Sequence, residues 1–396
     1  MNPQVIVAGH ICLDVIPTFG QGAGNLDEII VPGKLIQVGP PLLSTGGAVS
    51  NTGLALHRLG IPTKLIGKIG DDLFGRAITG ILSALSPDLA SGMIVTNDGP
   101  TSYTIVVNPP NVDRIFFHCP GANDTFHPSE IPLTDVEGAR ILHFGYPPLM
   151  KSVFSDGGSA LSDLFNQLRA KGISVSLDMA RPDPDSEAGR FDWLAFLERV
   201  LPAVDLFAPS IDEILYMIDR PLYDALSKRG GADPFTEGID GVILSRLGER
   251  LIGLGAAVVA IKIGSAGLYL RTSPDPARLQ PLVGAADAGS WAACEILSPC
   301  MKVTVKGTTG SGDCTIAGLL ASFVHHLSPV QAVTGAVVIG ACSVEQADAT
   351  SGVPSWKEVW RRIDSGWLKC DASIPLEGWV MDDKNGVWYG PGNQKN

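Results

Sequence analysis

The sequence of 396 residues lacks several patterns that mark common classes of protein. It contains no Walker A sequence, so any loop that binds phosphate must be of another kind. It contains no uncharged apolar run long enough to cross a bilayer, so we expect no membrane partner. Basic residues are in the minority, with 29 Lys and Arg against 41 Asp and Glu and a formal net charge of −12. Because nucleic acid attracts clustered Lys and Arg, this balance argues against a nucleic-acid partner.

Cysteine is also scarce and shows no pattern. The seven cysteines are odd in number, scattered along the chain and without a C-x-x-C pair. This arrangement indicates reduced thiols rather than a disulfide framework or a zinc site. An apolar run begins at Val5, directly after Met-Asn-Pro-Gln, which leaves no room for a signal peptide. With 45% hydrophobic and 18% charged residues, the composition is that of a well-packed enzyme, and we expect it in the cytoplasm.

Short apolar runs alternate with helical patterns along most of the chain. This rhythm predicts an α/β fold with a parallel, doubly wound sheet. Segments 101–107 and 114–118, separated by Asn-Pro-Pro-Asn, predict antiparallel strands joined by a turn. Residues 15–45, a segment interrupted by Gly and Pro that we call the excursion, could join these two strands in a small second sheet. The runs that predict buried strands of the main sheet are 5–9, 64–69, 140–144, 173–178, 205–208 and 257–263.

The stretch from Lys306 to Leu320 carries the strongest functional signal. It opens with glycines and hydroxyl residues, which permit a tight turn, and continues with apolar residues at helical spacing. Gly310, Ser311 and Gly312 would place backbone N–H groups at the positive end of this helix, where phosphate oxygens bind well. Asp313 beside them could take a proton from a hydroxyl that attacks a phosphoryl group. The alternative is that Asp313 only caps the helix.

Polar residues also follow predicted strands in the N-terminal part. Asp14 comes just after the strand at 5–9, where open α/β sheets keep their ligand sites; the alternative is a loop aspartate in solvent. Gly46 and Gly47 would let a ligand press on the backbone at a helix start. Asn51, one turn into that helix, can offer a donor and an acceptor, or it is incidental there.

Two later junctions carry weaker signals. Ser210 and Glu213 have the spacing of a capping box where a strand meets a helix. Glu213 could instead bind a metal through water, although the spacing alone favours the cap. Lys262, Gly264 and Gly267 form a strand end followed by a glycine turn, which by itself indicates no more than a hairpin.

Together these motifs resemble those of the ribokinase-like (PfkB) family of carbohydrate and nucleoside kinases. The resemblance covers about residues 4–352. It rests, in order, on Gly9 with Asp14, on Gly46-Gly-Ala-Val-Ser-Asn51 and on Thr308-Thr-Gly-Ser-Gly-Asp313. It implies a ribokinase-like kinase domain over residues 1–352, with a central mostly parallel sheet, helices on both faces and a small β-sheet lid over the acceptor. The lid corresponds to about 15–45 and 100–118.

The resemblance also implies an activity and a set of roles. The expected reaction is ATP-dependent phosphotransfer, with Mg²⁺, to a primary hydroxyl of a sugar or sugar-like polyol. A nucleoside kinase, or a nucleotide- or sugar-binding protein that has lost catalysis, remains an alternative. The implied catalytic residues are Asp313 as base and Gly310, Ser311 and Gly312 as anion hole. The implied acceptor binders are Asp14, Gly46, Gly47 and Asn51. The residues implied for ATP are Ser210, Lys262, Gly264, Gly267 and Thr309, and Glu213 would help to hold Mg²⁺.

The sequence departs from the family pattern at several positions. Ser210 replaces an asparagine, which weakens a direct phosphate contact. Gly307 replaces an aspartate that helps to hold a monovalent cation, so activation by K⁺ is doubtful. Cys12 replaces an asparagine that sugar-binding members often carry, so the acceptor is not simply ribose. Segments 216–250 and 272–300 are longer than is typical.

Residues 353–396 fall outside the family pattern. They hold five of the seven tryptophans, at 356, 360, 367, 379 and 388. Asn385-Gly386 predicts a type I′ hairpin turn. We interpret this segment as an appendage packed on the main domain or on a partner subunit. Because a lid that forms a subunit interface is common in the family, the resemblance also suggests a homodimer through the lid.

Overall fold

The computed structural model describes residues 3–19, 29, 31–107, 115–229 and 233–393. Its centre is an eleven-stranded sheet in the order β14-β15-β13-β12-β11-β10-β9-β8-β1-β4-β5. The seven strands from β11 to β5 are parallel, and the other four continue the sheet in antiparallel pairing. The predicted mostly parallel sheet is therefore confirmed. The strands are β1 Val5–Gly9, β4 Thr63–Gly70, β5 Met93–Thr96, β8 Ile141–Gly145, β9 Ser174–Leu177, β10 Leu206–Phe207, β11 Val258–Lys262, β12 Leu268–Thr272, β13 Glu295–Ser298, β14 Val380–Asp382 and β15 Val387–Tyr389.

The parallel strands are apolar on both faces, as their continuous hydrophobic runs require. In β1, Ile6 and Ala8 join one buried cluster, while Val5 and Val7 join the other. Successive side chains of a strand point to opposite faces, so each run supplies both cores. A sheet of this kind is stable only when both faces are covered.

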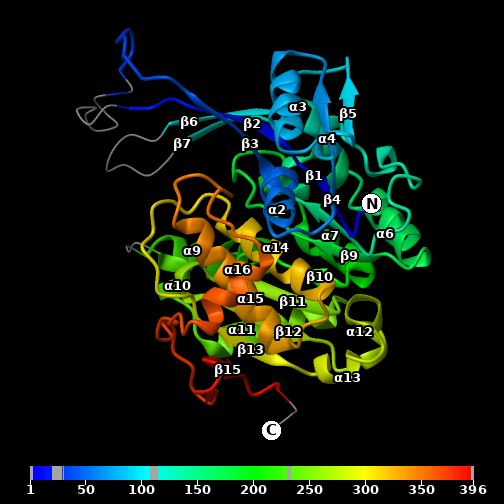
Figure 1. Cartoon of the computed structure of the whole chain (residues 1–396), viewed down its shortest axis with the longest axis vertical. Coiled ribbons are helices and arrows are strands. Elements are labelled where there is room, and N and C mark those ends of the chain that lie inside the picture. The colour runs from blue at the N-terminus through cyan, green and yellow to red at the C-terminus, as the bar shows by residue number, and fades with distance from the viewer. Residues whose placement is uncertain (1–2, 20–28, 30, 108–114, 230–232, 394–396) are drawn as a thin grey trace.

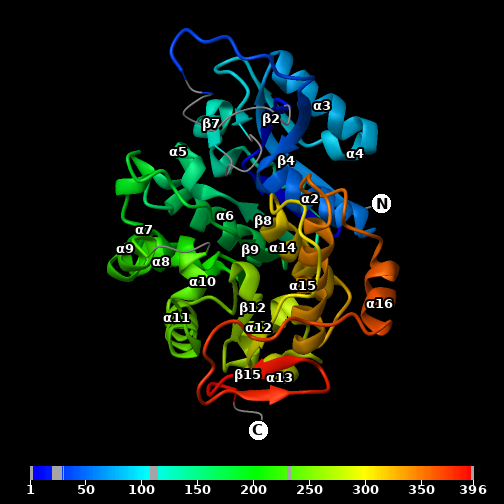
Figure 2. The ribbon, with the colours of Figure 1, turned by 90° about the vertical axis from the view of Figure 1, so that its left-hand side faces the viewer.

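Helices cover the two faces as separate layers (Figure 2). On one face lie α2 Gly47–Arg58, α3 Leu73–Leu85, α14 Ser311–Val324 and α15 Pro329–Val344. On the other lie α6 Ser159–Ala170, α7 Trp193–Val200, α8 Ile211–Ile218 and α11 Gly241–Gly253. The remaining α-helices are α4 Pro87–Ala90, α5 Lys151–Phe154, α9 Arg220–Ser227, α10 Pro234–Glu237, α12 Pro276–Val283, α13 Ala288–Trp291 and α16 Trp356–Asp364. None of the helices in the described ranges is long and apolar enough to cross a membrane.

A separate four-stranded sheet projects from the end of the molecule where the main strands finish (Figure 1). Its order is β3-β2-β6-β7, with β2 Cys12–Ile16, β3 Leu42–Gly46, β6 Tyr103–Val107 and β7 Ile115–Cys119. The antiparallel pairing of β6 with β7 is the one predicted from the sequence. We call this sheet the lid. Residues 20–28 and 30 of the predicted excursion at 15–45 lie outside the described residues.

The Trp-rich segment places a hairpin at the far end of the main sheet, opposite the lid (Figures 1 and 2). β15 pairs with β13, and β14 pairs with β15. The hairpin is confirmed, but its predicted type I′ turn is wrong. Asp382 pairs with Val387, so four residues form the loop, and only Gly386 in it has a positive φ, 61°. A type I′ turn would also need a positive φ at Asn385.

A buried carboxylate ties this hairpin to the sheet. Glu295 of β13 is fully buried and forms an ion pair with Arg271 at 2.9 Å. It also accepts hydrogen bonds from Ser245 Oγ at 2.6 Å and Tyr269 OH at 2.9 Å. The backbone N–H of Gly392, just after β15, donates to the same carboxylate. The tail therefore completes the hydrogen bonding of a buried charge, which would otherwise be costly.

Candidate active site

The glycine turn before α14 forms as the sequence predicts. Gly310 is the residue before the helix and has φ 71°, and a Cβ there would lie 2.6 Å from Ala349 Cβ. Ser311 begins the helix, and its N–H donates to Thr308 O at 3.3 Å. Asp313 stands in the first turn, where the helix dipole favours negative charge. Thr309 lies in the turn itself.

Asp313 does not cap the helix, so that alternative was wrong. Its carboxylate is 3% exposed and accepts hydrogen bonds from side chains of other elements. Asn51 Nδ2 donates to Oδ2 at 3.0 Å, and Tyr146 OH lies 2.9 Å from both carboxylate oxygens. Thr52 Oγ1 lies 3.4 Å from Oδ1. Burial raises the pKa of Asp313, and this outweighs the opposing effects of Lys262 and of the three donors.

A second group of charges surrounds Lys262 at the carboxyl ends of β9, β10 and β11. Lys262 Nζ forms an ion pair with Asp178 Oδ1 at 2.6 Å, and both side chains are largely buried. Burial raises the pKa of Asp178 to about 6 and that of Glu213 to about 8, although Lys262 lowers both. Gly312 lies against this lysine, since a Cβ there would be 3.3 Å from Lys262 Cδ. Asp313 and this charged group are therefore neighbours.

Glu213 does form the predicted capping contact. The Ser210 N–H donates to Glu213 Oε2 at 2.7 Å at the start of α8. Ser210 Oγ itself donates to Asp212 Oδ1 at 2.6 Å, and its backbone bridges to Lys262 across the sheet. Glu213 also interacts electrostatically with Lys262 and Asp178. Capping does not require this placement, because an N3 carboxylate can cap from solvent. The structure thus leaves one oxygen of Glu213, Oε1, for another partner.

Asp14 lies on the lid strand β2 rather than in a solvent loop, so the loop alternative was wrong. Burial raises its pKa to about 6, against hydrogen bonds from Cys12 and Thr104 that lower it. The Cys12 thiol donates to Asp14 Oδ1 at 3.4 Å. A Cβ on Gly46 would collide with the Asp14 carboxylate, which explains why glycine occupies this position on the neighbouring strand.

Two histidines lie between the lid and Tyr146. His10 Nε2 lies 3.4 Å from His118 Nε2, and His118 Nδ1 lies 3.0 Å from Thr104 Oγ1. The His10 ring is also 6.1 Å, centroid to centroid, from that of Tyr146. Burial lowers the pKa of His10 to about 3, so its imidazole is neutral. Gly47, with φ 84°, lets the helix start pass beside this ring, since a Cβ there would lie 2.5 Å from His10 Nδ1.

The glycine turn after Lys262 continues the same edge of the sheet. Gly264 and Gly267 have φ 47° and 109°, and the Cys300 thiol donates to Gly264 O at 3.4 Å. A Cβ at Gly267 would collide with Ser298 O. Within the described ranges, neither this turn nor Asp14 forms a hydrogen bond with Asp313. The structure therefore brings together the predicted site residues Asp313, Asn51, Gly312, Lys262, Ser210 and Glu213. Asp14 lies on the lid strand β2, and the Gly264–Gly267 turn follows β11.

Sequence reasoning missed Tyr146, Asp178 and the two histidines. Tyr146 directly follows β8, and Asp178 directly follows β9. The rule that pointed to Asp14, a polar residue just after a buried strand, would have found both. His10 also follows a strand, whereas nothing in the local sequence of β7 marks His118.

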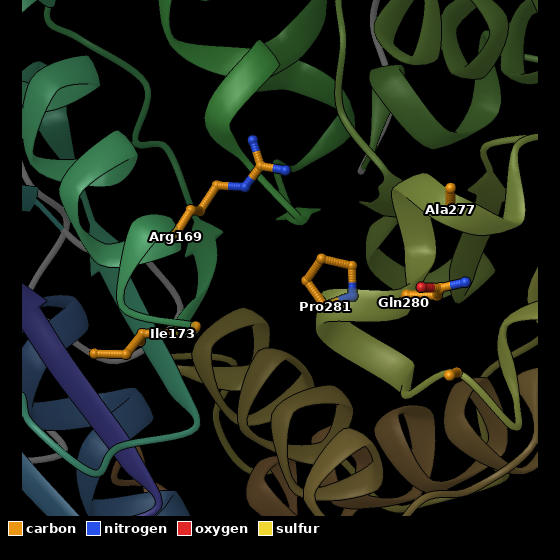
Figure 3. Close-up of a pocket in the computed structure, with 7 residues that line it drawn as sticks. Arg169, Ile173, Ala277, Gln280 and Pro281 are labelled. Carbon is orange, nitrogen blue, oxygen red and sulfur yellow. The ribbon is translucent and has the colours of Figure 1, made fainter.

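Two surface hollows of the described chain lie away from this cluster. One of about 460 Å³ is lined by α6 and α12 and by Ile173, at the amino end of β9 (Figure 3). Another, of about 440 Å³, lies beside Trp193 and Tyr216. Ligand sites of open α/β sheets occur at the carboxyl ends of the strands. The charged cluster beneath the lid therefore has the stronger claim to be the active site.

Comparisons with known proteins show which family this chain matches and which solved structures it resembles. Residues 16–356 match the model of the pfkB family carbohydrate kinases. Among curated proteins, probable fructokinase-7 from Arabidopsis thaliana is 26% identical over 91% of this chain and 92% of its own length. A fructokinase from Xylella fastidiosa with bound ATP superimposes with a TM-score of 0.66 at 18% identity, covering 91% of this chain and 98% of that one. Arabidopsis thaliana ribokinase complexed with ribose and ATP gives 0.64 at 18% identity, with the same coverage.

Proposed function

The chain belongs to the pfkB family of carbohydrate kinases, and from that premise we propose that it transfers the γ-phosphoryl group of ATP to a primary hydroxyl of a sugar or sugar-like polyol. The observation that carries this proposal is the buried carboxylate of Asp313 in the first turn of α14, behind a glycine turn. A base and an anion site stand side by side there. Phosphoryl transfer to a hydroxyl needs both.

In the proposed reaction, Asp313 accepts the proton of the attacking hydroxyl. General-base catalysis of this kind contributes about 10²–10⁴-fold. The N-terminal turn of α14, with Gly310, Ser311 and Gly312, stabilises charge on the transferring group. The Ser311 N–H has a weak partner in Thr308 O at 3.3 Å, which a phosphate oxygen can replace. Lys262, beside Gly312, adds a positive charge at the same end.

The ATP end of the site would be built by Lys262, the Gly264–Gly267 turn, Ser210 and Thr309. Asp178 and Glu213 fit a Mg²⁺ ion there, because burial raises the pKa of both carboxyl groups. A cation bound beside them would lower the cost of keeping them charged. The described residues contain no group of three or more His, Cys, Asp or Glu able to hold a metal. Phosphate and water would supply the other ligands, as is usual for Mg²⁺. When bound, the ion would neutralise phosphate charge.

The acceptor would lie between Asp313 and the lid, with Asp14 and the Gly46–Gly47 backbone as its proposed binders. We also propose Asn51 as a binder. Its Nδ2 donates a hydrogen bond to Asp313 in this structure, and its Oδ1 can accept one from a ligand. Asp14 accepts hydrogen bonds from the Cys12 thiol, at 3.4 Å, and from Thr104, and its carboxylate has further acceptor positions for sugar hydroxyls.

Activation by K⁺ remains doubtful on structural grounds as well. Gly307 packs against the turn at 346–347, where a Cβ would lie 2.9 Å from Ala347 O. The aspartate that the family often has at this position would need that turn to move. We therefore propose that the enzyme does not depend on a monovalent cation.

A panel of hexoses, pentoses, polyols and nucleosides, scored by ADP release with and without K⁺, tests the proposal. We expect release with a sugar or polyol and no dependence on K⁺. Replacing Asp14 with Asn should lower kcat/KM for that acceptor about 10–100-fold, because a hydrogen bond to a charged group contributes about 1.5–3 kcal/mol. The KM for ATP should not change. ADP release with nucleosides alone would assign the nucleoside alternative, and ATP binding without turnover on any acceptor would contradict the proposal.

We also propose a homodimer through the lid. The lid carries one cross-strand row of apolar residues on the face opposite to Asp14: Leu43, Val15, Ile105 and Phe117. Leu43, Ile105 and Phe117 are 47%, 36% and 52% exposed, which is unusual for a contiguous apolar row. Sedimentation velocity should show a dimer that Phe117→Glu converts to a monomer. Val242→Glu, at an exposed apolar position of α11, should leave it intact; a monomeric wild-type protein would contradict the proposal.

The domain boundary and the compartment remain proposals too. We place the kinase domain at 1–352 and the appendage at 353–396, supported by a family match that ends at residue 356. All seven cysteines are free thiols in the structure, which supports a reducing compartment such as the cytoplasm.

A further inference from the structure

Tyr146 holds the catalytic carboxylate in an unusual way. Its OH lies 2.9 Å from Oδ1 and 2.9 Å from Oδ2 of Asp313. Its backbone is left-handed, with φ 65° and ψ 48°, a conformation that is unfavourable for a non-glycine residue. Strained residues of this kind persist where the surrounding structure fixes them, and they cluster at functional sites. In this backbone conformation, the Tyr146 phenol lies against the Asp313 carboxylate.

Three side chains donate to the Asp313 carboxylate, and the Tyr146 OH is placed to bond either oxygen. Oδ2 accepts from Asn51 and Tyr146, and Oδ1 faces Tyr146 and Thr52. An attacking hydroxyl must itself lie within about 2.6–3.2 Å of a carboxylate oxygen to give up its proton. The Tyr146 phenol already occupies such a position, with its own O–H directed at the carboxylate. Phenol and acceptor hydroxyl therefore compete for the same place.

We propose that Tyr146 is a positioning residue that covers Asp313 until the acceptor hydroxyl displaces it, and that it thereby suppresses transfer of the phosphoryl group to water. This inference rests on the proposed kinase function. In the suppressed reaction, a water oxygen would form a bond to the γ-phosphorus, the bond to the β-phosphate oxygen would break to release ADP, and the water proton would pass to Asp313. A carboxylate covered by a phenol cannot take that proton.

The surroundings of Tyr146 explain how an acceptor, but not water, would displace it. Its ring lies 6.1 Å from that of His10, which contacts the lid residue His118. A polyol held by the lid would press on this side of the phenol and replace its hydrogen bond with one of its own. Water gains no such additional contacts. The backbone of Tyr146 is held by β8 before it and by Pro147 and Pro148 after it, so the motion is confined to the side chain.

The test compares Tyr146→Phe with the wild-type enzyme. Removing the OH should raise ATP hydrolysis in the absence of acceptor about tenfold, which corresponds to one hydrogen bond to a charged group. Phosphotransfer to the acceptor should be retained. Because the Tyr146 hydrogen bond lowers the pKa of Asp313, its loss should move the acid limb of the kcat/KM profile to higher pH. Tyr103→Phe, in β6 of the lid with its ring against Phe74, is the matched control and should behave as wild type.

A second substitution keeps the proposal testable if Tyr146→Phe folds poorly. Fluorinated tyrosine at position 146 preserves the ring and makes the OH a stronger donor. It should lower hydrolysis without acceptor and move the acid limb to lower pH. An enzyme that phosphorylates a sugar but shows no change in hydrolysis or pH profile in either variant would overturn the role of Tyr146. An enzyme that phosphorylates nothing in the acceptor panel would instead overturn the proposed function.

Discussion

Asp313→Asn should abolish most phosphotransfer while the protein still folds and binds ATP. We expect kcat to fall about 10²–10⁴-fold, the usual contribution of a general base. Asparagine has the shape of aspartate and can still accept hydrogen bonds from Asn51 and Tyr146, but it cannot take up a proton. The measurement is ADP release at saturating ATP and acceptor.

The interpretation depends on separating lost chemistry from lost structure. Thermal unfolding and the Kd for ATP should match the wild-type values, since Asp313 is already largely desolvated and the variant carries no buried charge. Asp371→Asn removes one exposed carboxylate from the tail and should leave turnover unchanged. Near-wild-type turnover in Asp313→Asn would show that another group takes the proton.

Lys262→Met should reduce the free energy of unfolding by about 3–5 kcal/mol, the usual effect of removing one partner of a buried ion pair. The substitution leaves Asp178 and Glu213 buried without their cation. Lys151→Met provides a matched control, because Lys151 pairs with Glu187 at the same 2.6 Å. Both members of that pair are more than half exposed, so water screens them and their loss should have little effect.

Urea unfolding at several pH values tests the cause of this loss. Glu213 has a pKa raised to about 8, so below that pH its folded form takes up a proton that the unfolded form does not. Proton uptake by the folded state stabilises it as the pH falls. Because Lys262 lowers the pKa of Glu213, its removal raises that pKa further. The cost of Lys262→Met should therefore be largest well above pH 8 and should shrink as the pH falls towards 8. An equal loss in Lys262→Met and Lys151→Met would contradict a buried charge cluster.

The sequence predicted much of the fold because the signals were local. Continuous apolar runs marked β1, β8, β9 and β11, and the glycine turn marked the start of α14. The candidate site was harder, because its contacts are long-range. Tyr146 and Asp313 are 167 residues apart, and Asn51 and Asp313 are 262 apart. Helix spacing alone left Asp313 as either a cap or a base, and only the packing of α14 against α2 and the end of β8 brings its partners to it.

The pairing of β15 with β13 has a consequence for biosynthesis. α14, α15 and α16 are all translated between these two strands. The edge of β13 therefore stays unpaired on the ribosome until β15 has been made. In that interval, Glu295 lacks the Gly392 N–H, and an unpaired strand edge can pair with other chains. Domains fold as they emerge, from the N-terminus onward. The nascent kinase is thus most prone to misassociation late in synthesis, when a chaperone that shields a sheet edge would be most useful to it.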